Sequence, residues 1–494
     1  MPSNDLNNAR RYVERDKDFL WHPFTPMKQW IESGDEPGRV IVAGEGFELI
    51  DHEGRRFIDG FGSLWCSLHG HRVPEIDDAI RQQLDRIAHS TLLGHASPPS
   101  IELAERLVRI SPPGLEKVFY SDSGATAVEV ALKMAYQFYR NRGQAKRHRF
   151  LALSQSYHGD TIGSVSIGGI DTFHRMFRPL LFEATFVDSP NPYYHPAGNR
   201  AGEIVLQQVE DILAGSAEEY CAMIVEPLVQ GAAGMLTHPA GFLKGLRELT
   251  RKYDVLLIAD EVATGFCATG KLFACEHEGV CPDLMCLGKR LTGGYLPVAA
   301  TLATRDVFDA FCGEVAEGKT FYHGHTFTGN ALGCAAGVAS IDRIESTGLL
   351  QALPAKIELI SSRMLEVKKH PNVGDVRQCG LMTGIELVAK KDGAGNVSRP
   401  SGTRVARASR PRTHTTARSQ DGCDTRGQDA RDTRMTFDPQ DRVGAKVCFA
   451  ARSRGLIIRP LGDVVVLMPA PAMDLGTLDR LLTITLETIH DYFA

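Results

Sequence analysis

The pattern of apolar and polar positions changes near residue 98 of this chain. From there to about residue 303, short apolar runs alternate with segments whose apolar residues recur at helical spacing. The runs predict strands and the periodic segments predict helices. Strands are expected at 117–120, 150–154, 222–225, 255–259, 284–288 and 298–303, and helices at 101–110, 127–141 and 242–252. This alternation is typical of a doubly wound, mostly parallel sheet, so we predict an α/β fold.

The two ends of the chain predict a second, smaller α/β domain. Near the N-terminus, three short alternating runs predict an antiparallel meander at 41–43, 47–51 and 56–59, with a helix near 74–87. A helix at 330–344 is expected to cross back to this domain. Further strands are predicted at 381–388, 455–458 and 464–468, with helices at 443–454 and 475–489. We therefore predict a large domain over 71–345, and a small domain built from 1–70 and 346–494.

The segment from Arg399 to Arg434 differs from both domains. It has nine arginines and no lysine, aromatic residue, leucine or isoleucine. Such a segment buries too little apolar surface to offset its ordering entropy, so 393–437 is predicted to be a disordered insertion. A basic patch for RNA or another anionic surface is one alternative, and an oddity of the gene or its reading frame is another.

Length, charge and cysteine usage limit the class of protein. A chain of 494 residues favours two domains, and the net charge of -5 gives no reason to expect nucleic acid. No apolar run approaches the roughly 20 residues that span a bilayer. The polar N-terminus lacks the apolar core of a secretory signal, and the 11 cysteines are scattered without zinc spacing. We expect a cytoplasmic protein with reduced thiols, no metal site, and no membrane or nucleic-acid partner.

The stretch 256–297 carries two ionisable residues at the ends of predicted strands. Asp260 ends the apolar run 255–259, and Lys289 follows the run 284–288 and precedes Gly293-Gly294. The carboxyl ends of parallel strands are where α/β folds bind cofactors. A lysine in a dry pocket can act as a Schiff-base nucleophile, and an aspartate can keep a pyridine nitrogen protonated. Either residue alone is more often an ordinary loop carboxylate or surface lysine.

Other strand ends carry weaker signals. The turn 121–126 has small residues that allow backbone N–H groups at a helix N-terminus to approach a phosphate, although such turns are also common caps. Tyr157 is placed to stack on an aromatic cofactor or simply to pack. Thr326 is a loop hydroxyl suited to a phosphate. Arg459 suits bidentate capture of a carboxylate, with a structural salt bridge as the alternative. No predicted strand precedes G-x-G-x-x-G, which disfavours a dinucleotide-linked dehydrogenase.

Taken together, these motifs resemble the class III pyridoxal-phosphate aminotransferases of fold type I. The segments that carry the resemblance are DEVATGF, SYHGDT, LGK followed by LTGG, and HTFTGN. WHPFTPM, SLWCSLHGH, IAHSTLLG, GKLFACEHEGVCPDLMCLGK and RPLGDVVVLMP are similar to the biotin-pathway branch of that class. The resemblance covers about 20–395 and 438–490. It implies a homodimer that uses pyridoxal 5'-phosphate.

The resemblance also implies roles for residues. Lys289 is the Schiff-base lysine and proton shuttle, and Asp260 pairs with the pyridinium nitrogen. The remaining implied contacts are Tyr157 on the cofactor ring, Gly124 and Ala125 on the phosphate, His325 and Thr326 reaching the phosphate from the partner subunit, Arg459 on the substrate carboxylate, and Phe24, Leu64, Trp65 and Gly324 lining the substrate pocket together with Tyr157 and Lys289.

Several positions depart from the family pattern. Cys267-Ala268 stand where a glycine and an arginine are usual, so whatever that arginine braces is expected to be lost. Arg290 stands where a small residue is usual and adds a charge beside Lys289. Ala125 replaces a frequent serine.

The implied reaction is transamination of 8-amino-7-oxononanoate to 7,8-diaminononanoate, with S-adenosyl-L-methionine as amino donor. Phe24 and Leu64 replace a tyrosine and a tryptophan that are frequent in adenosylmethionine-using relatives, which leaves L-lysine open as the donor. Another class III ω-aminotransferase is a near alternative, against which Trp65 and Arg459 argue. A catalytically idle binding or regulatory homologue is an alternative of a different class, motivated by Cys267-Ala268 and the insertion.

Overall fold

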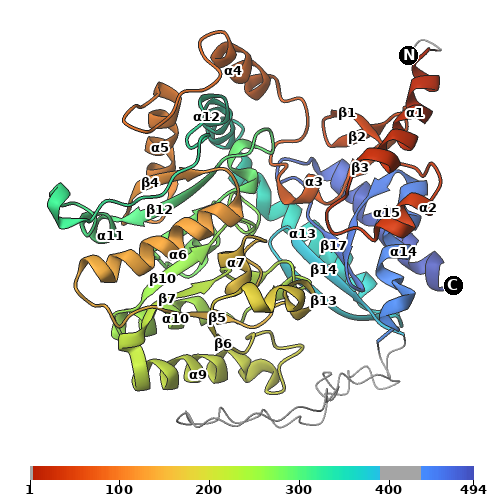
Figure 1. The fold of residues 1–494 in the computed structure, drawn as a ribbon. Helices are drawn as coiled ribbons and strands as arrows, with labels where there is room; N and C mark the ends of the chain where they lie inside the picture. Colours follow the sequence, from red (N-terminus) through yellow and green to blue (C-terminus); the bar gives the residue numbers. More distant parts are fainter. Residues whose placement is uncertain (1–3, 390–435) are drawn as a thin grey trace, which may run out of the picture.

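The computed structural model describes residues 4–389 and 436–494. A large lobe holds the middle of the chain, and a smaller lobe holds elements from both ends, with the two termini on the same side (Figure 1). The helices of the N-terminal part and their neighbours are α1 (Asn4–Phe19), α2 (Met27–Glu32), α3 (Gly62–Trp65), α4 (Pro74–Leu84) and α5 (Pro98–Ile110).

A seven-stranded sheet forms the centre of the large lobe. Its strands lie in the order β4-β12-β11-β10-β7-β5-β6. They are β4 (Leu115–Ser121), β5 (Arg149–Leu153), β6 (Thr185–Val187), β7 (Tyr220–Val225), β10 (Leu256–Asp260), β11 (Leu284–Leu287) and β12 (Ala299–Thr304). Only β12 runs against its neighbours, pairing antiparallel with both β11 and β4. The prediction of a mostly parallel sheet is confirmed. The other six strands therefore share one carboxyl edge.

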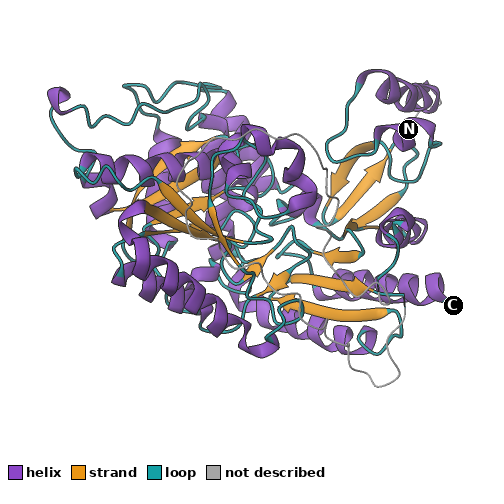
Figure 2. Ribbon diagram, turned by 60° about the horizontal axis from the view of Figure 1, so that its bottom comes forward, coloured by secondary structure: helices purple, strands orange, loops and turns teal. Residues whose placement is uncertain are grey.

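Helices cover both faces of this sheet, as Figure 2 shows. Alternate residues of β7 point to opposite faces of the sheet, and each set packs against different helices. Ala222 and Ile224 pack in the cluster that α6 (Gly124–Asn141) contributes to, whereas Met223 and Val225 pack with α9 (Ala201–Ser216) and α10 (Phe242–Lys252). Every residue of β7 is buried, as expected of a strand covered on both sides.

The smaller lobe joins the two chain ends through strand pairing. One sheet contains β1 (Ile41–Glu45), β2 (Glu48–Asp51), β3 (Arg56–Asp59) and β15 (Leu456–Ile457). Within it, Leu456 pairs in parallel with Ile58. A second sheet contains β13 (Val373–Cys379), β14 (Met382–Leu387), β17 (Val464–Leu467) and β16 (Arg459–Leu461). Helices α13 (Leu349–Val367), α14 (Val443–Ala450) and α15 (Leu475–Phe493) pack here.

Most predicted strands and helices occur within a few residues of their expected positions. The periodicity of the sequence does not single out α9, α13, β6 or β13. The remaining α-helices and strands of the described residues are α7 (Ile162–Ser166), α8 (Asp171–His174), α11 (Arg305–Asp309), α12 (Ala331–Ser346), β8 (Val229–Gln230) and β9 (Leu236–Thr237).

The predicted disordered insertion lies almost entirely outside the described residues. The described chain resumes just before Phe437, whose ring stacks on that of Phe493 at a centroid distance of 5.9 Å. Among the described residues, no helix has the length and apolar character needed to cross a membrane.

Candidate active site

The carboxyl edge of the central sheet brings together residues that are far apart in sequence. Asp260 is the last residue of β10, and its register partner on β11 is Cys286, three residues before Lys289. Glu226 follows β7, His158 follows β5, and Gly124 follows β4. Because these five strands are mutually parallel, their ends converge at one edge, where cofactors bind in folds of this type.

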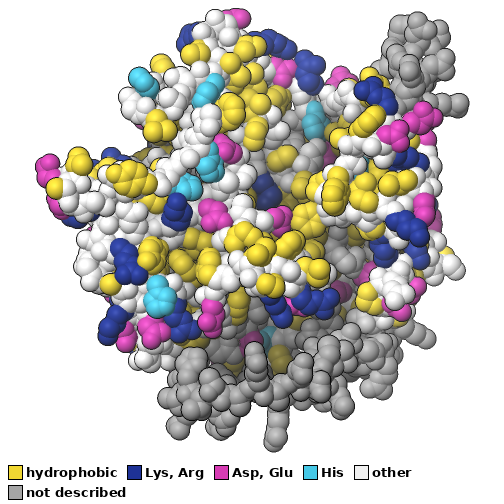
Figure 3. Space-filling model, in the orientation of Figure 1, with side chains coloured by type: hydrophobic (Ala, Val, Ile, Leu, Met, Phe, Trp, Pro, Cys, Tyr) yellow, Lys and Arg dark blue, Asp and Glu magenta, His cyan; other side chains and the backbone are white. Residues whose placement is uncertain are grey.

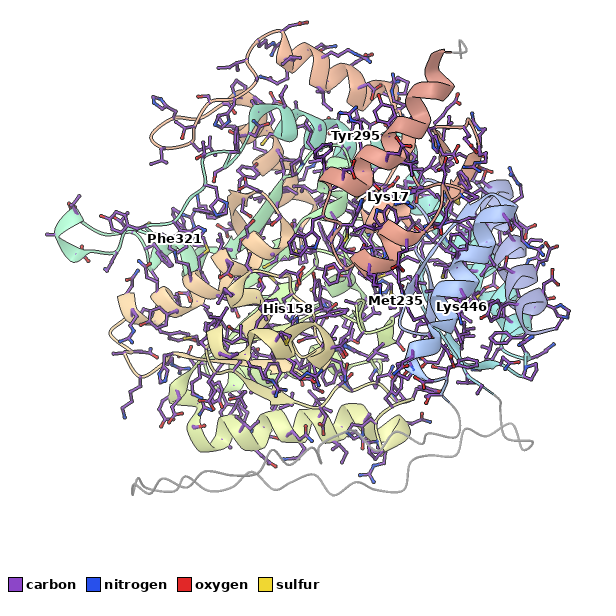
Figure 4. All side chains as sticks on the ribbon, turned by 45° about the vertical axis from the view of Figure 1, so that its right-hand side comes forward. Lys17, His158, Met235, Tyr295, Phe321 and Lys446 are labelled. Carbon is purple, nitrogen blue, oxygen red and sulfur yellow. The ribbon has the colours of Figure 1, made fainter. Side chains whose placement is uncertain are left out.

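Asp260 is fixed by two hydrogen bonds. Its Oδ2 atom lies 2.7 Å from Nδ1 of His158, and its Oδ1 atom accepts a hydrogen bond of 3.1 Å from the N–H of Val262. Asp260 and His158 are both buried. Figure 4 shows His158 near the middle of the molecule. The sequence alone does not mark His158 as a functional residue, although its position after a parallel strand is a signal that it carries.

Lys289 opens the turn that follows β11, with a left-handed φ of 42°. Its Nζ atom lies 5.2 Å from the centre of the Trp65 ring. Burial lowers the pKa of Lys289, Arg290 lowers it further, and the carboxylates of Asp260 and Glu226 oppose both effects. A lowered pKa favours the neutral amine, which is the nucleophilic form.

Glu226 is a second buried carboxyl group that sequence reasoning missed. Its two oxygens accept hydrogen bonds from the N–H groups of Tyr157, at 3.0 Å, and Gly231, at 2.9 Å. Burial raises the pKa of Glu226 to about 7, and the nearby Asp260 charge adds to the rise. The group therefore ties the Tyr157 segment to the centre of the site.

The N-terminus of α6 offers free backbone donors to this edge. Ser123 and Thr126 form a capping box, with the Ser123 N–H donating to Thr126 Oγ1 at 2.9 Å. The N–H groups of the first helical turn have no acceptor within the helix. A Cβ atom added at Gly124 would lie only 2.4 Å from Cγ1 of Val262, so only glycine fits here. Ala125 is packed as tightly, because a Cβ atom added at Gly159 would lie 2.3 Å from the Cβ atom of Ala125.

Residues 323–326 follow Phe321, which is labelled in Figure 4 and whose ring lies 5.7 Å from that of His323. Nδ1 of His325 lies 2.7 Å from Oδ2 of Asp122 of the same chain, just before α6. Gly324 and Thr326 are exposed, and Thr326 forms no side-chain hydrogen bond to the described residues. Within one chain, the structure therefore brings His325 toward the start of α6 but leaves Thr326 facing outward.

The predicted pocket residues form two groups. Tyr157 donates a 2.7 Å hydrogen bond to Asp160, and its ring contacts that of Phe173, which in turn packs on Phe24 at 5.4 Å. Burial raises the pKa of the Tyr157 hydroxyl.

Leu64 and Trp65 make the second group, on the side of Lys289. Trp65 is 7% exposed and Leu64 is 49% exposed. Trp65 contributes to an apolar cluster with Ala263, Ala268 and Met382.

Arg459 begins β16 and has no carboxylate partner among the described residues. Burial lowers the pKa of its guanidinium, and the proximity of Tyr157 partly opposes this. The structural salt bridge considered as an alternative is therefore absent from the described part of the chain.

Arg290 does not project a charge into the pocket beside Lys289. It is 1% exposed, and its Nη1 atom donates a 3.0 Å hydrogen bond to the carbonyl oxygen of Ala263. Burial lowers the pKa of Arg290 to about 10, and the proximity of Cys66 and Cys267 partly opposes this shift. A guanidinium from the Lys289 turn thus bonds to the loop that carries Cys267 and Ala268, the loop in which the family's usual arginine is missing.

The model of the class-III aminotransferase family matches residues 32–490. The chain is 46% identical over 494 residues to an adenosylmethionine-8-amino-7-oxononanoate aminotransferase of Geobacter sulfurreducens, covering 99% of each chain. It is 48% identical over 473 residues to the enzyme of that name from Nitratidesulfovibrio vulgaris, covering 95% of this chain and 79% of the relative.

Solved structures agree with these relatives. The crystal structure of the enzyme of the same name from Methanocaldococcus jannaschii superposes with a TM-score of 0.85 at 37% identity, covering 97% of this chain and 99% of that one. A thermostable (S)-enantioselective omega-transaminase from Thermomicrobium roseum also gives 0.85, at 29% identity and 99% coverage of both chains. This chain belongs to the class-III aminotransferase family. It is a pyridoxal-phosphate-dependent transferase, as predicted.

The residues at the carboxyl edge fit pyridoxal phosphate. The buried carboxylate of Asp260 suits a protonated ring nitrogen, and the uncharged amine favoured at Lys289 suits an aldehyde. The first turn of α6 supplies N–H donors for a phosphate. The buried hydroxyl of Ser121, at the end of β4, has no hydrogen-bond partner among the described residues and is a further polar group at this end of the site.

Proposed function

We propose that this enzyme converts 8-amino-7-oxononanoate to 7,8-diaminononanoate in biotin synthesis, with S-adenosyl-L-methionine as the amino donor. The names of the similar enzymes support this reaction. The observation in the structure that carries it is Arg459. This half-buried guanidinium lies near Tyr157 and has no carboxylate partner among the described residues, which suits a substrate with a free carboxylate.

The cofactor, when bound, supplies an aldehyde that accepts the amino group and a protonated pyridine ring that draws electrons from the substrate carbon. The chain supplies the rest of the chemistry. Lys289 holds the cofactor and then moves a proton to and from the substrate carbon with its Nζ atom. The carboxylate of Asp260 keeps the ring nitrogen protonated, and His158 holds that carboxylate in place. Gly124 and Ala125 bind the phosphate through their N–H groups.

The remaining residues form the substrate side of the proposed site. Tyr157 packs on the ring, and Arg459 binds the carboxylate of the keto acid. Phe24, Leu64, Trp65 and Gly324 line the pocket, and their apolar surfaces exclude water from the reacting amine.

We also propose a homodimer, in which His325 and Thr326 reach the phosphate of the partner's site. The outward position of Thr326 supports this, since it has no polar partner in its own chain among the described residues. Large apolar side chains are also exposed, among them Trp21, Leu93, Met176, Tyr322 and Phe327. Apolar side chains gather along the middle of one face of the molecule in Figure 3, as an interface requires.

A cytoplasmic location is consistent with the cysteines. All ten cysteines in the described residues are free thiols, the state expected in a reducing compartment.

L-lysine remains a specific second candidate for the donor, because Phe24 and Leu64 replace larger polar or aromatic side chains. A single half-reaction distinguishes between the two amino donors. Cofactor-loaded protein is mixed with S-adenosyl-L-methionine or with L-lysine, and the visible absorption of the cofactor is followed until it changes to that of the aminated form. A change with adenosylmethionine supports the proposal, and a change with lysine alone reassigns the donor.

Protein that loads cofactor but responds to neither donor overturns the proposed reaction and points to another ω-aminotransferase. Protein that binds no cofactor supports an idle homologue. Lys289→Ala protein is the negative control, because it lacks the amine that holds the cofactor. It should show neither turnover nor the absorption of cofactor bound to Lys289. Lys244→Ala, which alters an exposed lysine, should behave as the parent does.

A further inference from the structure

Helix α3 is a single left-handed turn at the edge of the active site. Gly62, Ser63, Leu64 and Trp65 have φ values of 57°, 46°, 66° and 70°. Three of these residues carry a side chain, and each is strained in this conformation because its Cβ crowds the following carbonyl oxygen. Four consecutive residues in this conformation require other contacts that hold them there.

Asp59 supplies those contacts. It is the last residue of β3 and is 3% exposed. Its Oδ1 atom accepts a 2.9 Å hydrogen bond from the N–H of Ser63, and its Oδ2 atom accepts one of 2.7 Å from the Ser63 hydroxyl. Nε2 of His71 lies 3.1 Å from the same Oδ2 atom. One carboxylate therefore joins the end of the strand to the strained turn and to the segment beyond it.

The surroundings prevent the turn from relaxing into another conformation. Asp59 itself pairs with Ile457 of β15, and Gly60 accepts a 3.0 Å hydrogen bond from the N–H of Met468. A Cβ atom added at Gly294 would lie 2.8 Å from the carbonyl oxygen of Cys66. The turn is thus held between the C-terminal strands and the loop after Lys289.

The turn carries two of the proposed pocket residues. It places the ring of Trp65 5.2 Å from Nζ of Lys289 and leaves Leu64 half exposed next to it. Gly231 also packs closely on Trp65, since a Cβ added there would lie 3.1 Å from the ring. A change in the turn would therefore move both side chains relative to the reacting amine.

We propose that Asp59 is a positioning residue of the substrate pocket, whose carboxylate fixes the left-handed turn that presents Leu64 and Trp65 beside Lys289. Asp59 acts through these two side chains and touches neither substrate nor cofactor. The inference rests on the proposed function only in the choice of substrate, and its first test needs neither substrate nor cofactor.

The first test measures the position of Trp65 in cofactor-free protein. The chain has three tryptophans, so Trp21→Phe with Trp30→Phe leaves Trp65 as the only one. Quenching of its fluorescence by acrylamide reports its burial. Asp59→Ala should increase the quenching constant several-fold, and Ser63→Ala should increase it less. Asp59→Asn retains one acceptor oxygen and should lie closest to the parent.

Asp51 provides a matched control. It is another fully buried aspartate of the same small sheet, and it accepts hydrogen bonds from Gly38, Glu53 and Arg55 rather than from the turn. Asp51→Ala should lower the melting temperature without changing the quenching of Trp65. Equal quenching in the parent and Ser63→Ala would overturn the proposal, even if Asp59→Ala fails to fold.

The second test separates positioning from general destabilisation. Asp59→Ala should raise the KM for 8-amino-7-oxononanoate by roughly tenfold or more, with a smaller effect on kcat, because a displaced pocket wall weakens orientation. Ser63→Ala and Asp59→Asn should raise the KM less. In a Trp65→Phe background the added effect on KM should shrink, because both changes act through the same side chain. Fully additive effects on KM would contradict the proposal. A chain inactive on this substrate would refute the proposed function. The quenching test would still show whether Asp59 positions Trp65.

Discussion

Nδ1 of His158 lies 2.7 Å from Oδ2 of Asp260, and both side chains are buried at the carboxyl edge of the central sheet. The two residues are 102 positions apart in the sequence. With the second Asp260 oxygen bonded to the N–H of Val262, the carboxylate is oriented before any cofactor arrives. This preorganisation makes His158 part of the proposed cofactor site.

His158→Ala should weaken cofactor binding. Hydrogen bonds to charged groups contribute about 1.5–3 kcal/mol, so the dissociation constant should rise roughly tenfold to hundredfold. Absorption titration of cofactor-free protein measures it. His238→Phe is the control, since His238 packs against Phe242 and its ring has no polar partner in the described residues. An unchanged constant in His158→Ala would show that Asp260 does not need this support.

Lys289 makes the stability of cofactor-free protein depend on pH. Its pKa is lowered in the folded state, so the unfolded chain binds more protons between the folded pKa and the ordinary value of 10.5. Stability should therefore rise with pH through that window. Lys289→Met removes this contribution. It should melt at a higher temperature than the parent at pH 7, with the difference shrinking toward pH 10. A difference in melting temperature between the two proteins that stays constant from pH 7 to pH 10 would contradict the lowered pKa of Lys289.

Arg290 should influence when Lys289 becomes neutral. Its guanidinium lowers the pKa of Lys289, so Arg290→Met should raise that pKa and leave less neutral amine at a given pH. The rate at which cofactor-free protein captures pyridoxal phosphate should then begin to rise at a higher pH. Arg290→Lys keeps the charge and should stay closer to the parent. Identical pH profiles for all three proteins would rule out an electrostatic role.

Arg459→Ala should act on one half-reaction. Loss of a charged hydrogen-bonding partner worth about 1.5–3 kcal/mol predicts a KM for the keto acid raised roughly tenfold to hundredfold. The half-reaction with the amino donor should be less affected. Arg454→Ala, which removes an arginine paired with Glu487 and Asp491 on the surface of the same lobe, serves as the control. An unaltered dependence on the keto acid would remove Arg459 from the site.

The proposed dimer makes a prediction about mixed subunits. If Thr326 serves the partner's site, a hybrid of Lys289→Ala and Thr326→Ala subunits contains one site with both Lys289 and Thr326 intact. Mixing and reassociating the two variants should then restore activity above the level of Thr326→Ala alone. If Thr326 acts within its own chain, mixing gives no gain. Size measurement by light scattering confirms that hybrids are dimers.

The amino-acid sequence alone determined the type of sheet and the residues at two of its strand ends. The apolar runs before Asp260 and Lys289 are local signals, because a strand buried on both faces needs nearly continuous apolar residues. Parallel pairing then places their ends together without further information. The same reasoning did not reveal His158 or Glu226 as site residues, since many side chains follow parallel strands and only packing selects those that turn inward.

Only the tertiary structure decided how the site is supported. The sequence shows Arg290 as an extra charge next to Lys289, but the fold buries its guanidinium against the Ala263 carbonyl. It shows Asp59 as the end of a strand, but the left-handed turn that this carboxylate holds also depends on contacts with residues near 457 and 468. Periodicity reports local burial, whereas these positions are set by hydrogen bonds and contacts between distant segments that form only in the folded chain.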